Sequence, residues 1–595
     1  MSSIRIRLRV ISKARIILFH CVRSRSECGF SRPQCPLVMS TPLLPYQVLG
    51  GLALIYVSWS LLKLLGGFLT PKGLRHLPGP APKSFLTGCF DDIFDKNSGW
   101  QYHQYLADHY GSVVKIKGLL GATCLYVYDP LALHHIFVKD QQFYEESDDF
   151  VQTNRMFFGQ GLGTSVGERH RLQRKLVMPS FSIAHLREMV NVFYQVSHRL
   201  HVTFQDLGKN SDQQVDVVVW MSRLALELIG QSGLGCSFDT LTTDTQPHPF
   251  GVAAKMLLPL SSSIPPLRRL LMPWIGKFEH WPRLGRFLVD LIPAKSVVDL
   301  TFVVDTINKT ATEILASKKA AILTGDEAAK DEVGQGKDLI SALLKANMFA
   351  PEKERLKENE LLGQVASLTF AAVDTTSSAL SRILYLLATH KDVQERLRQE
   401  VRDARKENGG QDPDHDTLVA LPYLDAVCRE TLRLYAPVTK VDRVTTADMI
   451  LPLSTPIKGI DGTEIHSLSV PKGTQIIVSI LGSNRNPELW GPDAMEWKPD
   501  RWLQPLPEVL IKARVPGIYS HLMTFISGGR SCIGFKFSQL EMKSVLATIL
   551  EDIEFSLGEK EIHWHMGNVT TPTTDINSVA PTMPMKIRYI GKGSD

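Results

Sequence analysis

The stretch Phe-Ile-Ser-Gly-Gly-Arg-Ser-Cys-Ile-Gly at residues 525–534 decides the fold of this chain. It places Cys532 on a glycine-rich turn immediately before a segment with the apolar spacing of a helix. Unpaired backbone N–H groups and the positive end of a helix dipole favour a thiolate at such a position, and Arg530 adds positive charge. Because the thiolate is the form of cysteine that binds metal, Cys532 is a candidate metal ligand.

The glycines of this turn, Gly528 and Gly534 among them, leave room for a large flat group against the backbone, and Phe525 offers that group an apolar contact. An isolated free cysteine is more often a small buried hydrophobe than a ligand. The spacing F-x-x-G-x-R-x-C-x-G reverses that expectation, because it resembles the haem-binding loop of the cytochrome P-450 family. The resemblance implies a cytochrome P-450 fold, mainly α-helical with small β-sheets. It also implies haem b with the Cys532 thiolate as the axial ligand of its iron.

Length and composition exclude several other classes of protein. The 595 residues are 44% apolar and have a net charge of only +5, which does not indicate a nucleic-acid-binding protein. The eight cysteines include no C-x-x-C pair, and the five that follow residue 38 lie far apart. This pattern argues against a zinc site or a disulfide framework and for a reducing compartment.

Residues 48–69 form an apolar run with one charge, Lys63, and are long enough to cross a bilayer as a helix. We predict a single transmembrane anchor there. Basic residues follow it, so the positive-inside rule places residues 84–595, the predicted catalytic domain, in the cytosol, with the endoplasmic reticulum as the expected membrane. The proline-rich segment 77–82 predicts a stiff hinge, which membrane-bound members of the resembled family have between anchor and catalytic domain.

The basic N-terminal extension, residues 1–38, conflicts with this topology. It carries eight Lys or Arg against one acid, which opposes its transfer into a lumen. Two explanations stay open: the segment is an acid-poor transit peptide, or translation begins at Met39. We favour the start at Met39, because the apolar run follows it directly.

The remaining pattern predicts short strands at 113–116, 124–128 and 474–480, a helix opening at Asp129–Pro130, and a hairpin turn at Asp461–Gly462. A long, largely apolar helix is predicted from about residue 361 to 390, a length that suits a helix crossing the whole domain.

An acid and a hydroxyl, Asp374 and Thr375, lie inside this apolar helix, where they are costly unless something uses them. They match the acid–alcohol pair that conducts protons during oxygen activation in the resembled family, although Ala372 replaces the glycine that is usual two residues before the acid. This resemblance implies a catalytic role for both residues. The alternative is that the Thr375 hydroxyl only bonds to a carbonyl one turn earlier.

Three basic side chains match positions that bind haem propionates in the resembled family. His170 and Arg174 are four residues apart and share one helical face, and His170 stands where tryptophan is commonest. Arg443 lies a few residues past Pro437, after the helix that carries Glu430 and Arg433. A solvated basic surface is the alternative interpretation of the segment at 167–175.

Glu430 and Arg433 form the E-x-x-R pattern of the resembled family, and the later loop Trp-Lys-Pro-Asp-Arg-Trp at 497–502 supplies Arg501. The resemblance implies that these three residues form a structural network behind the haem.

Four basic residues, Lys536, Lys543, Arg171 and Lys175, flank the segments that bear Cys532 and Arg174. Together they predict a positive docking surface for an acidic electron donor. The resemblance implies an NADPH–cytochrome reductase as that donor, with cytochrome b5 as a second candidate. Ordinary solubility is the alternative for any one of these residues.

The resemblance implies monooxygenation of a lipophilic small molecule, a terpenoid or other secondary metabolite, because the sequence looks closest to fungal members of the family. The predicted substrate pocket is apolar or weakly polar: Phe370, Val373, Val438, Val441 and Thr570. Two alternatives remain, namely a haem-thiolate isomerase or dehydratase that does not use O2, and a membrane haem-binding protein without turnover. Reductase-dependent NADPH consumption would separate the last from an enzyme.

Overall fold

The long central helix α15 (Glu358–Thr389) organises the computed structural model, which describes residues 70–209, 213–262, 282–324 and 338–591. This helix confirms the one predicted for residues 361–390. The predicted extension 1–38 and anchor 48–69 lie outside the described residues. In the part of the chain that is described, no helix combines the length and the apolar character that crossing a membrane requires.

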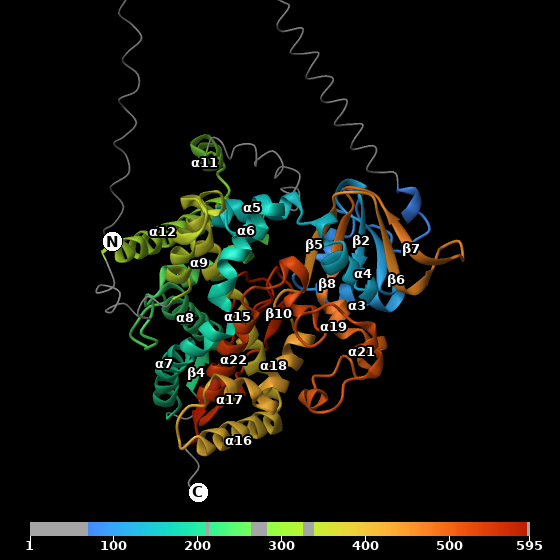
Figure 1. Ribbon diagram of the computed structural model, residues 1–595. Coiled ribbons are helices and arrows are strands. Elements are labelled where there is room, and N and C mark those ends of the chain that lie inside the picture. The colour runs from blue at the N-terminus through green and yellow to red at the C-terminus, as the bar shows by residue number, and fades with distance from the viewer. Residues whose placement is uncertain (1–69, 210–212, 263–281, 325–337, 592–595) are drawn as a thin grey trace, which may run out of the picture. The chain divides into compact units, whose positions relative to one another are not determined.

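Helix α15 is buried on most of its circumference because other helices cover it. The Glu360 carboxylate accepts the Lys357 backbone N–H at 2.8 Å and so closes the first turn. The helix packs against α8 (Val217–Ile229), α12 (Lys295–Thr324) and α22 (Phe535–Ile549). A helix that is apolar on nearly all sides belongs in a core, and Figure 1 shows α15 surrounded by helices.

A five-stranded sheet in the order β1-β2-β8-β5-β3 lies on the other side of the domain from most of the helices (Figure 1). Its strands are β1 (Val113–Lys117), β2 (Thr123–Val127), β3 (Tyr144–Glu145), β5 (Lys440–Thr445) and β8 (Gln475–Ser479). Only β2 and β8 pair in parallel. The sheet confirms the strands predicted at 113–116, 124–128 and 474–480.

Smaller sheets complete the fold. They are the hairpin of β6 (Met449–Lys458) and β7 (Glu464–Val470), the pair β10 (His563–His565) and β11 (Thr571–Thr573), and the sheet of β4 (Gln213–Asp216), β12 (Pro584–Tyr589) and β9 (Ile553–Leu557). The β6–β7 turn confirms the hairpin predicted at Asp461–Gly462, where Gly462 has φ of +84°.

The other helices are α2 (Phe90–Ile93), α3 (Gly99–Tyr110), α4 (Pro130–His134), α5 (Asp148–Phe158), α6 (Gly167–Val177), α7 (Ile183–Gly208), α9 (Pro249–Ser262), α11 (Pro282–Asp290), α14 (Leu339–Phe349), α16 (Lys391–Glu407), α17 (His415–Ala420), α18 (Pro422–Leu434), α19 (Ile480–Arg485), α20 (Pro487–Trp490) and α21 (Glu508–Ala513).

The proline-rich segment at 77–82 lies against β1 in this structure. Leu77 is fully buried, and the Pro78 carbonyl accepts the Lys115 N–H at 3.0 Å. The segment is therefore fixed to the sheet at its start.

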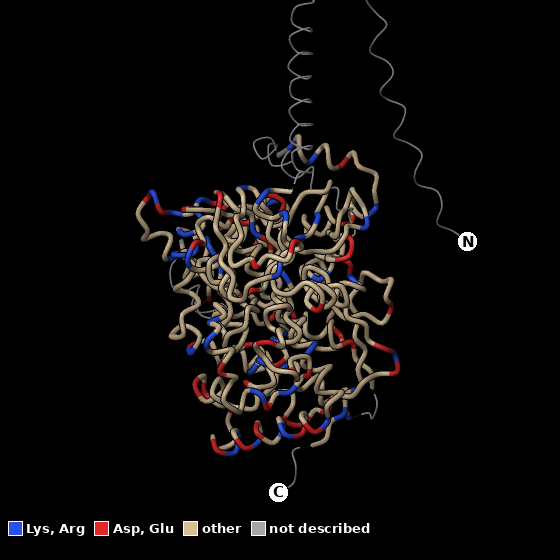
Figure 2. The backbone as a smooth tube through the Cα atoms, turned by 90° about the vertical axis from the view of Figure 1, so that its right-hand side faces the viewer, with Lys and Arg blue, Asp and Glu red and all other residues tan. Residues whose placement is uncertain are grey.

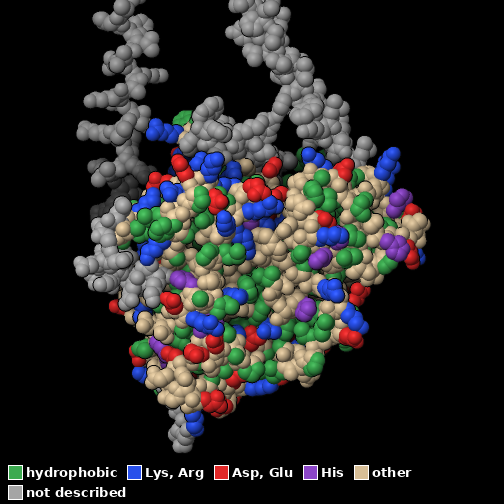
Figure 3. All heavy atoms as spheres, viewed as in Figure 1, with side chains coloured by type: hydrophobic (Ala, Val, Ile, Leu, Met, Phe, Trp, Pro, Cys, Tyr) green, Lys and Arg blue, Asp and Glu red, His purple; other side chains and the backbone are tan. Residues whose placement is uncertain are grey.

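Charges of both signs are interspersed along the described backbone (Figure 2), and the face seen in Figure 3 mixes apolar, basic and acidic side chains. In these two views the described surface is not dominated by one sign of charge.

Candidate active site

The Cys532 loop is held by backbone contacts on both sides. The Cys532 N–H donates to the Phe525 carbonyl at 3.0 Å, and the N–H of Gly529 donates to the Gln141 side chain at 2.7 Å. Gly528 has φ of +66°, and a Cβ there would lie 1.7 Å from the Phe137 carbonyl oxygen. Only glycine allows this approach, so the position of the loop depends on residue 528.

The environment of the Cys532 thiol differs from the one expected. The side chain is exposed, yet the surrounding protein desolvates it, and this burial raises the pKa of the Cys532 thiol. The Gly534 N–H and the charge of Arg174 act in the opposite direction and lower that pKa. The helix end acts in the expected direction, because Gly534 is the N-cap residue of α22, whereas the cation that lowers this pKa is Arg174 and not the expected Arg530. Helix α22 begins at Phe535, and Arg530 lies 3.2 Å from the Glu145 carboxylate instead.

Two of the basic residues of α6, His170 and Arg174, lie beside this loop. Arg174 donates to the Ser531 carbonyl at 2.7 Å and to the Ser531 hydroxyl at 2.9 Å. His170 is 6% exposed, and burial together with the nearby cations Arg530 and Arg174 lowers the pKa of His170 to about 3. Its imidazole is therefore neutral at pH 7 and can donate one hydrogen bond.

Arg443, on β5, is 2% exposed and lies against the ring of Phe137. Its Nη1 donates to Glu146 at 2.9 Å and to the Asp442 carbonyl at 2.7 Å. Its Nη2 is buried and has no hydrogen-bond partner among the described residues. A buried guanidinium with an unused N–H group is suited to receive a carboxylate from outside the chain.

One side of α15 faces an open space. Ala371 is exposed and Thr375 is half-buried, although Val373 between them is fully buried. The Thr375 hydroxyl donates to the Ala371 carbonyl at 2.8 Å, the bond that the alternative interpretation anticipated. Because α15 packs against α22, which follows the Cys532 loop, this accessible side and the loop belong to adjacent elements.

Asp374 is buried and paired with a lysine that the sequence did not single out. The Lys255 Nζ lies 2.7 Å from the Asp374 carboxylate and 3.2 Å from its carbonyl oxygen. Lys255 is itself 8% exposed. The charge of the acid is thus compensated across two helices, α9 and α15.

The structure brings Glu430, Arg433 and Arg501 together in the core. Glu430 accepts from Arg433 at 2.8 and 2.9 Å and from Arg501 at 3.3 Å, and both Glu430 and Arg433 are fully buried. Its two oxygens also accept the Lys498 N–H and the Trp502 indole N–H.

The predicted substrate-pocket residues divide into two sets. Phe370, Val438 and Val441 are partly exposed, and the Phe370 ring packs 4.8 Å from that of Phe158. Val373 and Thr570 are instead buried within the packing. The Thr570 N–H donates to the Pro437 carbonyl at 2.9 Å, so its backbone belongs to the wall behind Val438.

The long helix, the buried E-x-x-R cluster and the Cys532 loop follow one another along the chain in that order. The family model described as cytochrome P450 matches residues 78–576. The chain belongs to the cytochrome P450 family. Its membership makes it a cytochrome P450 monooxygenase by class, and the family implies haem-thiolate iron.

Several fungal P450s resemble this chain over most of their length. Cytochrome P450 monooxygenase 91 of Postia placenta is 50% identical over 531 residues, which cover 89% of this chain and 97% of the relative. Ganoderic acid synthetase CYP5150L8 of Ganoderma lucidum is 43% identical over 525 residues, 88% of this chain and 95% of the relative. A P450 of Hericium erinaceus named eriI is 36% identical over 522 residues, 86% and 93% of the two chains.

The residues around Cys532 fit a haem. A hollow of about 70 Å³ lies at the edge of the Cys532 loop and is lined by His170, Arg443, Ser527 and Arg530, among others. Two buried polar atoms of this lining, Arg443 Nη2 and Ser527 Oγ, have no partner among the described residues. A soft sulfur ligand together with unpaired donors for carboxylates is the set that an iron porphyrin requires.

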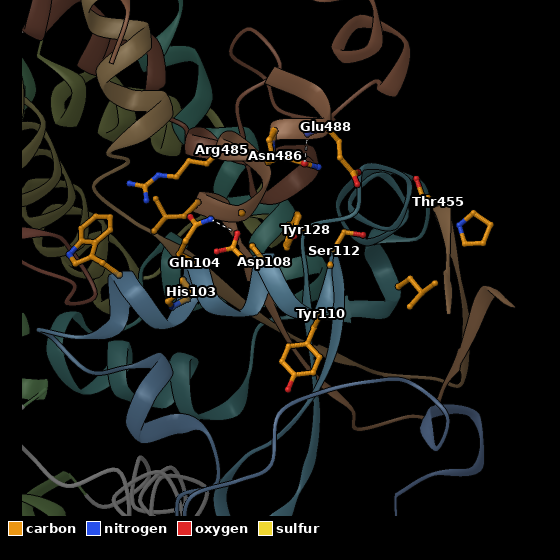
Figure 4. Close-up of a pocket in the computed structure, with 18 residues that line it drawn as sticks. His103, Gln104, Asp108, Tyr110, Ser112, Tyr128, Thr455, Arg485, Asn486 and Glu488 are labelled. Carbon is orange, nitrogen blue, oxygen red and sulfur yellow. Dashed lines mark hydrogen bonds between the residues drawn. The ribbon is translucent and has the colours of Figure 1, made fainter. Parts of the chain in front are cut away.

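A larger hollow, of about 290 Å³, lies between α3 and α19 and contains none of the predicted site residues. Figure 4 shows Arg485 and His103 at one end and Glu488 and Thr455 at the other. We assign no part of the P450 reaction to it.

The predicted docking surface needs one correction. Lys543 is 2% exposed, and its Nζ lies 2.8 Å from Asp425 and donates to the Val419 carbonyl, so it supports the core. Arg171 and Lys175 are exposed, but each lies beside an acid, Glu168 and Glu354. The positive surface is therefore smaller than the sequence suggested.

Sequence reasoning did not find Lys255 or Glu146. For Lys255 a signal existed. It is the only charged residue in α9, and Asp374 is likewise the only acid near the middle of α15. No local pattern points to Glu146, because its partner Arg443 is 297 residues away.

Proposed function

We propose that this P450 inserts one atom of O2 into a lipophilic small molecule of secondary metabolism, such as a terpenoid, with electrons from NADPH through a separate reductase. The observation that carries the proposal is an exposed Cys532 thiol on the loop that leads into α22, the helix that packs against α15. The name of the Ganoderma lucidum relative, a ganoderic acid synthetase, supports a biosynthetic role.

Haem, when bound, supplies the activation of O2 and the oxidation of the C–H bond. Cys532 would hold the haem iron through its thiolate. The Gly534 N–H and Arg174, which lower the pKa of Cys532, would stabilise the anionic sulfur. Arg443, Arg530 and His170 would bind the porphyrin carboxylates from the edge of the loop.

Asp374 and Thr375 move protons along α15, as an acid and a hydroxyl on adjacent residues can. Lys255 fixes the orientation of the Asp374 carboxylate through their 2.7 Å contact. The partly exposed Phe370, Val438 and Val441 orient the lipophile and keep water away from the reacting centre. Val373 and Thr570, which are buried, support these side chains from behind.

The experiment that tests this function is co-expression with an NADPH–P450 reductase in microsomes, followed by mass spectrometry for a gain of one oxygen across a terpenoid panel. The matched control is Cys532→Ser. We expect product and NADPH consumption with the native chain only, and a thiolate-type carbon monoxide spectrum that the variant lacks. Native protein that loads no haem, or a variant that retains both activity and spectrum, would refute the proposal. Cytochrome b5 added to the assay tests the second donor.

We also propose that residues 48–69 anchor the enzyme in the endoplasmic reticulum with the catalytic domain in the cytosol, and that residues 77–82 link the two. Carbonate extraction of microsomes should leave the full chain in the pellet and release a chain that begins at residue 70. Protease added outside the vesicles should digest the catalytic domain. The mature N-terminus, determined by sequencing, decides between Met39 and an upstream start.

A further inference from the structure

The guanidinium of Arg443 is fixed on one side and unsatisfied on the other. Its Nη1 donates to Glu146 at 2.9 Å, whereas its Nη2 is buried without a partner among the described residues. Both atoms belong to a side chain that is 2% exposed. An unused N–H group on such a side chain has lost its water without gaining another partner, and a bound acceptor would supply that partner.

The sheet places Glu146 opposite Arg443. Strands β3 and β5 pair antiparallel, with Tyr144 opposite Thr445 and Glu145 opposite Val444. The next step of the same register brings Glu146 opposite Arg443. The strand pairing directly before Glu146 therefore brings it close to Arg443, and its side chain is only 11% exposed.

Groups of both signs face Glu146. Burial raises the pKa of Glu146, the cations Arg443 and Arg530 lower it, and the acids Asp442 and Glu145 raise it again. The neutral His170 and the cationic Arg530 share with Arg443 the lining of the 70 Å³ hollow described above. Ser527, whose hydroxyl is likewise buried without a partner in the described part of the chain, lines it as well. A space of this size accommodates a carboxylate group.

We propose that Glu146 is a positioning residue for haem: by holding Nη1 of Arg443 it directs Nη2 into the hollow, and its charge offsets that of the arginine toward a porphyrin carboxylate. The inference rests on the proposed haem function. Two effects follow that can be separated, because one depends on the hydrogen bond and the other on the charge. Losing the acceptor loosens haem, whereas losing only the charge leaves the hollow more positive.

The test uses full-length haem-loaded protein in detergent and three variants: Glu146→Ala, Glu146→Gln, and Glu554→Ala as a control. Glu554 and Arg588 form a cross-strand pair in another sheet, with a 2.9 Å bond, so the control removes the same kind of contact away from the loop. The readouts are the rate of haem loss to an apomyoglobin acceptor and the haem midpoint potential by spectroelectrochemistry.

We expect Glu146→Ala to lose haem about 10-fold faster, the lower end of the effect of removing a group that orients a ligand-binding side chain. Glu146→Gln keeps an oxygen acceptor, so it should retain haem at least as well as the native protein while its midpoint potential moves upward, because added positive charge favours the reduced form. A purely structural role for Glu146 would not move the potential. The Glu554→Ala control should match the native protein in both readouts.

An unchanged midpoint potential in Glu146→Gln together with unchanged haem loss in Glu146→Ala would overturn the inference. If Glu146→Ala does not fold, the potential of Glu146→Gln decides alone. The failure of the proposed function looks different, since the native protein itself would then lack the thiolate-type carbon monoxide spectrum.

Discussion

Two buried arginine–glutamate clusters lie in this P450, and they differ in whether their hydrogen bonds are complete. In the cluster of Glu430 and Arg433, all five N–H groups of the arginine are used: three partners are backbone carbonyls and two are glutamate oxygens. In the cluster of Glu146 and Arg443, the arginine keeps a buried Nη2 with no partner among the described residues.

This difference separates a structural role from a binding role. A saturated ionic cluster has no capacity left for a ligand, so it can only hold the fold together, and removing one member leaves an uncompensated charge. An unsaturated cluster at equal burial is stable only if something completes it. The same residue types, with similar bond lengths, therefore serve different purposes according to the donors that remain unused.

The largest effect should come from breaking the saturated cluster. Glu430→Ala leaves Arg433 buried without its acid, although Arg501 keeps Asp493, so we expect a loss of about 3–5 kcal/mol in the free energy of unfolding. Denaturant titration measures it, with Glu508→Ala as the control, because the Glu508–Lys512 pair is exposed and worth about 0–1 kcal/mol. Equal midpoints for the two variants would contradict the assignment of Glu430 as structural.

Asp374 and Lys255 form a third buried pair, in which the acid is proposed to work during turnover. Asp374→Asn keeps the size of the side chain but removes the proton-transfer group, so kcat should fall about 100-fold, the lower end for general acid–base catalysis. Product formation per NADPH consumed measures the effect. Haem content should stay native, and a variant that lost haem instead would place Asp374 with the structural cluster.

A smaller effect is expected when the cluster of Glu146 and Arg443 keeps its positive charge but loses the planar guanidinium group. Arg443→Lys cannot reach Glu146 and a haem carboxylate with one planar fork, so haem should be lost about 10-fold faster while the fold persists. Circular dichroism and haem transfer to apomyoglobin check both parts. Loss of the folded state would show that Arg443 behaves like Arg433 after all.

The smallest effect concerns Glu541 on α22, a carboxyl that is fully buried. Burial raises the pKa of Glu541 well above its usual value. Between the unfolded pKa near 4.5 and the raised folded pKa, the folded state binds the extra proton, so stability falls as pH rises. Glu541→Gln should remove that slope and gain about 1 kcal/mol at pH 8 relative to the native protein. Parallel pH profiles of the unfolding midpoint for the two proteins would contradict this.

Much of the fold could be predicted from local patterns. The strands at β1, β2 and β8, the Asp461–Gly462 turn and the long helix α15 each follow from periodicity or turn chemistry that a short segment carries by itself. The spacing around Cys532 identified the family, because it combines five positions in ten residues. The anchor predicted at 48–69 lies outside the described residues and stays a prediction.

The parts that escaped prediction depend on distant neighbours. Lys543 was expected at the surface because charged side chains usually lie there, but on α22 it faces the core and pairs with Asp425. Neighbours in the sequence explain only part of the environment of the Cys532 thiol. Burial raises its pKa and the adjacent Gly534 N–H lowers it, but the cation that also lowers it is Arg174, 358 positions earlier in the chain. The pairing of Glu146 with Arg443 requires the strand register, which one sequence does not reveal.

The contact between Gly528 and the Phe137 carbonyl has a practical consequence for redesigning the substrate range of this enzyme. Any side chain at residue 528 would collide with that carbonyl, so the Cys532 loop would have to move and carry the sulfur with it. Mutant libraries should therefore leave residue 528 unchanged. Diversity is better introduced at residues 370, 438 and 441, whose side chains are partly accessible.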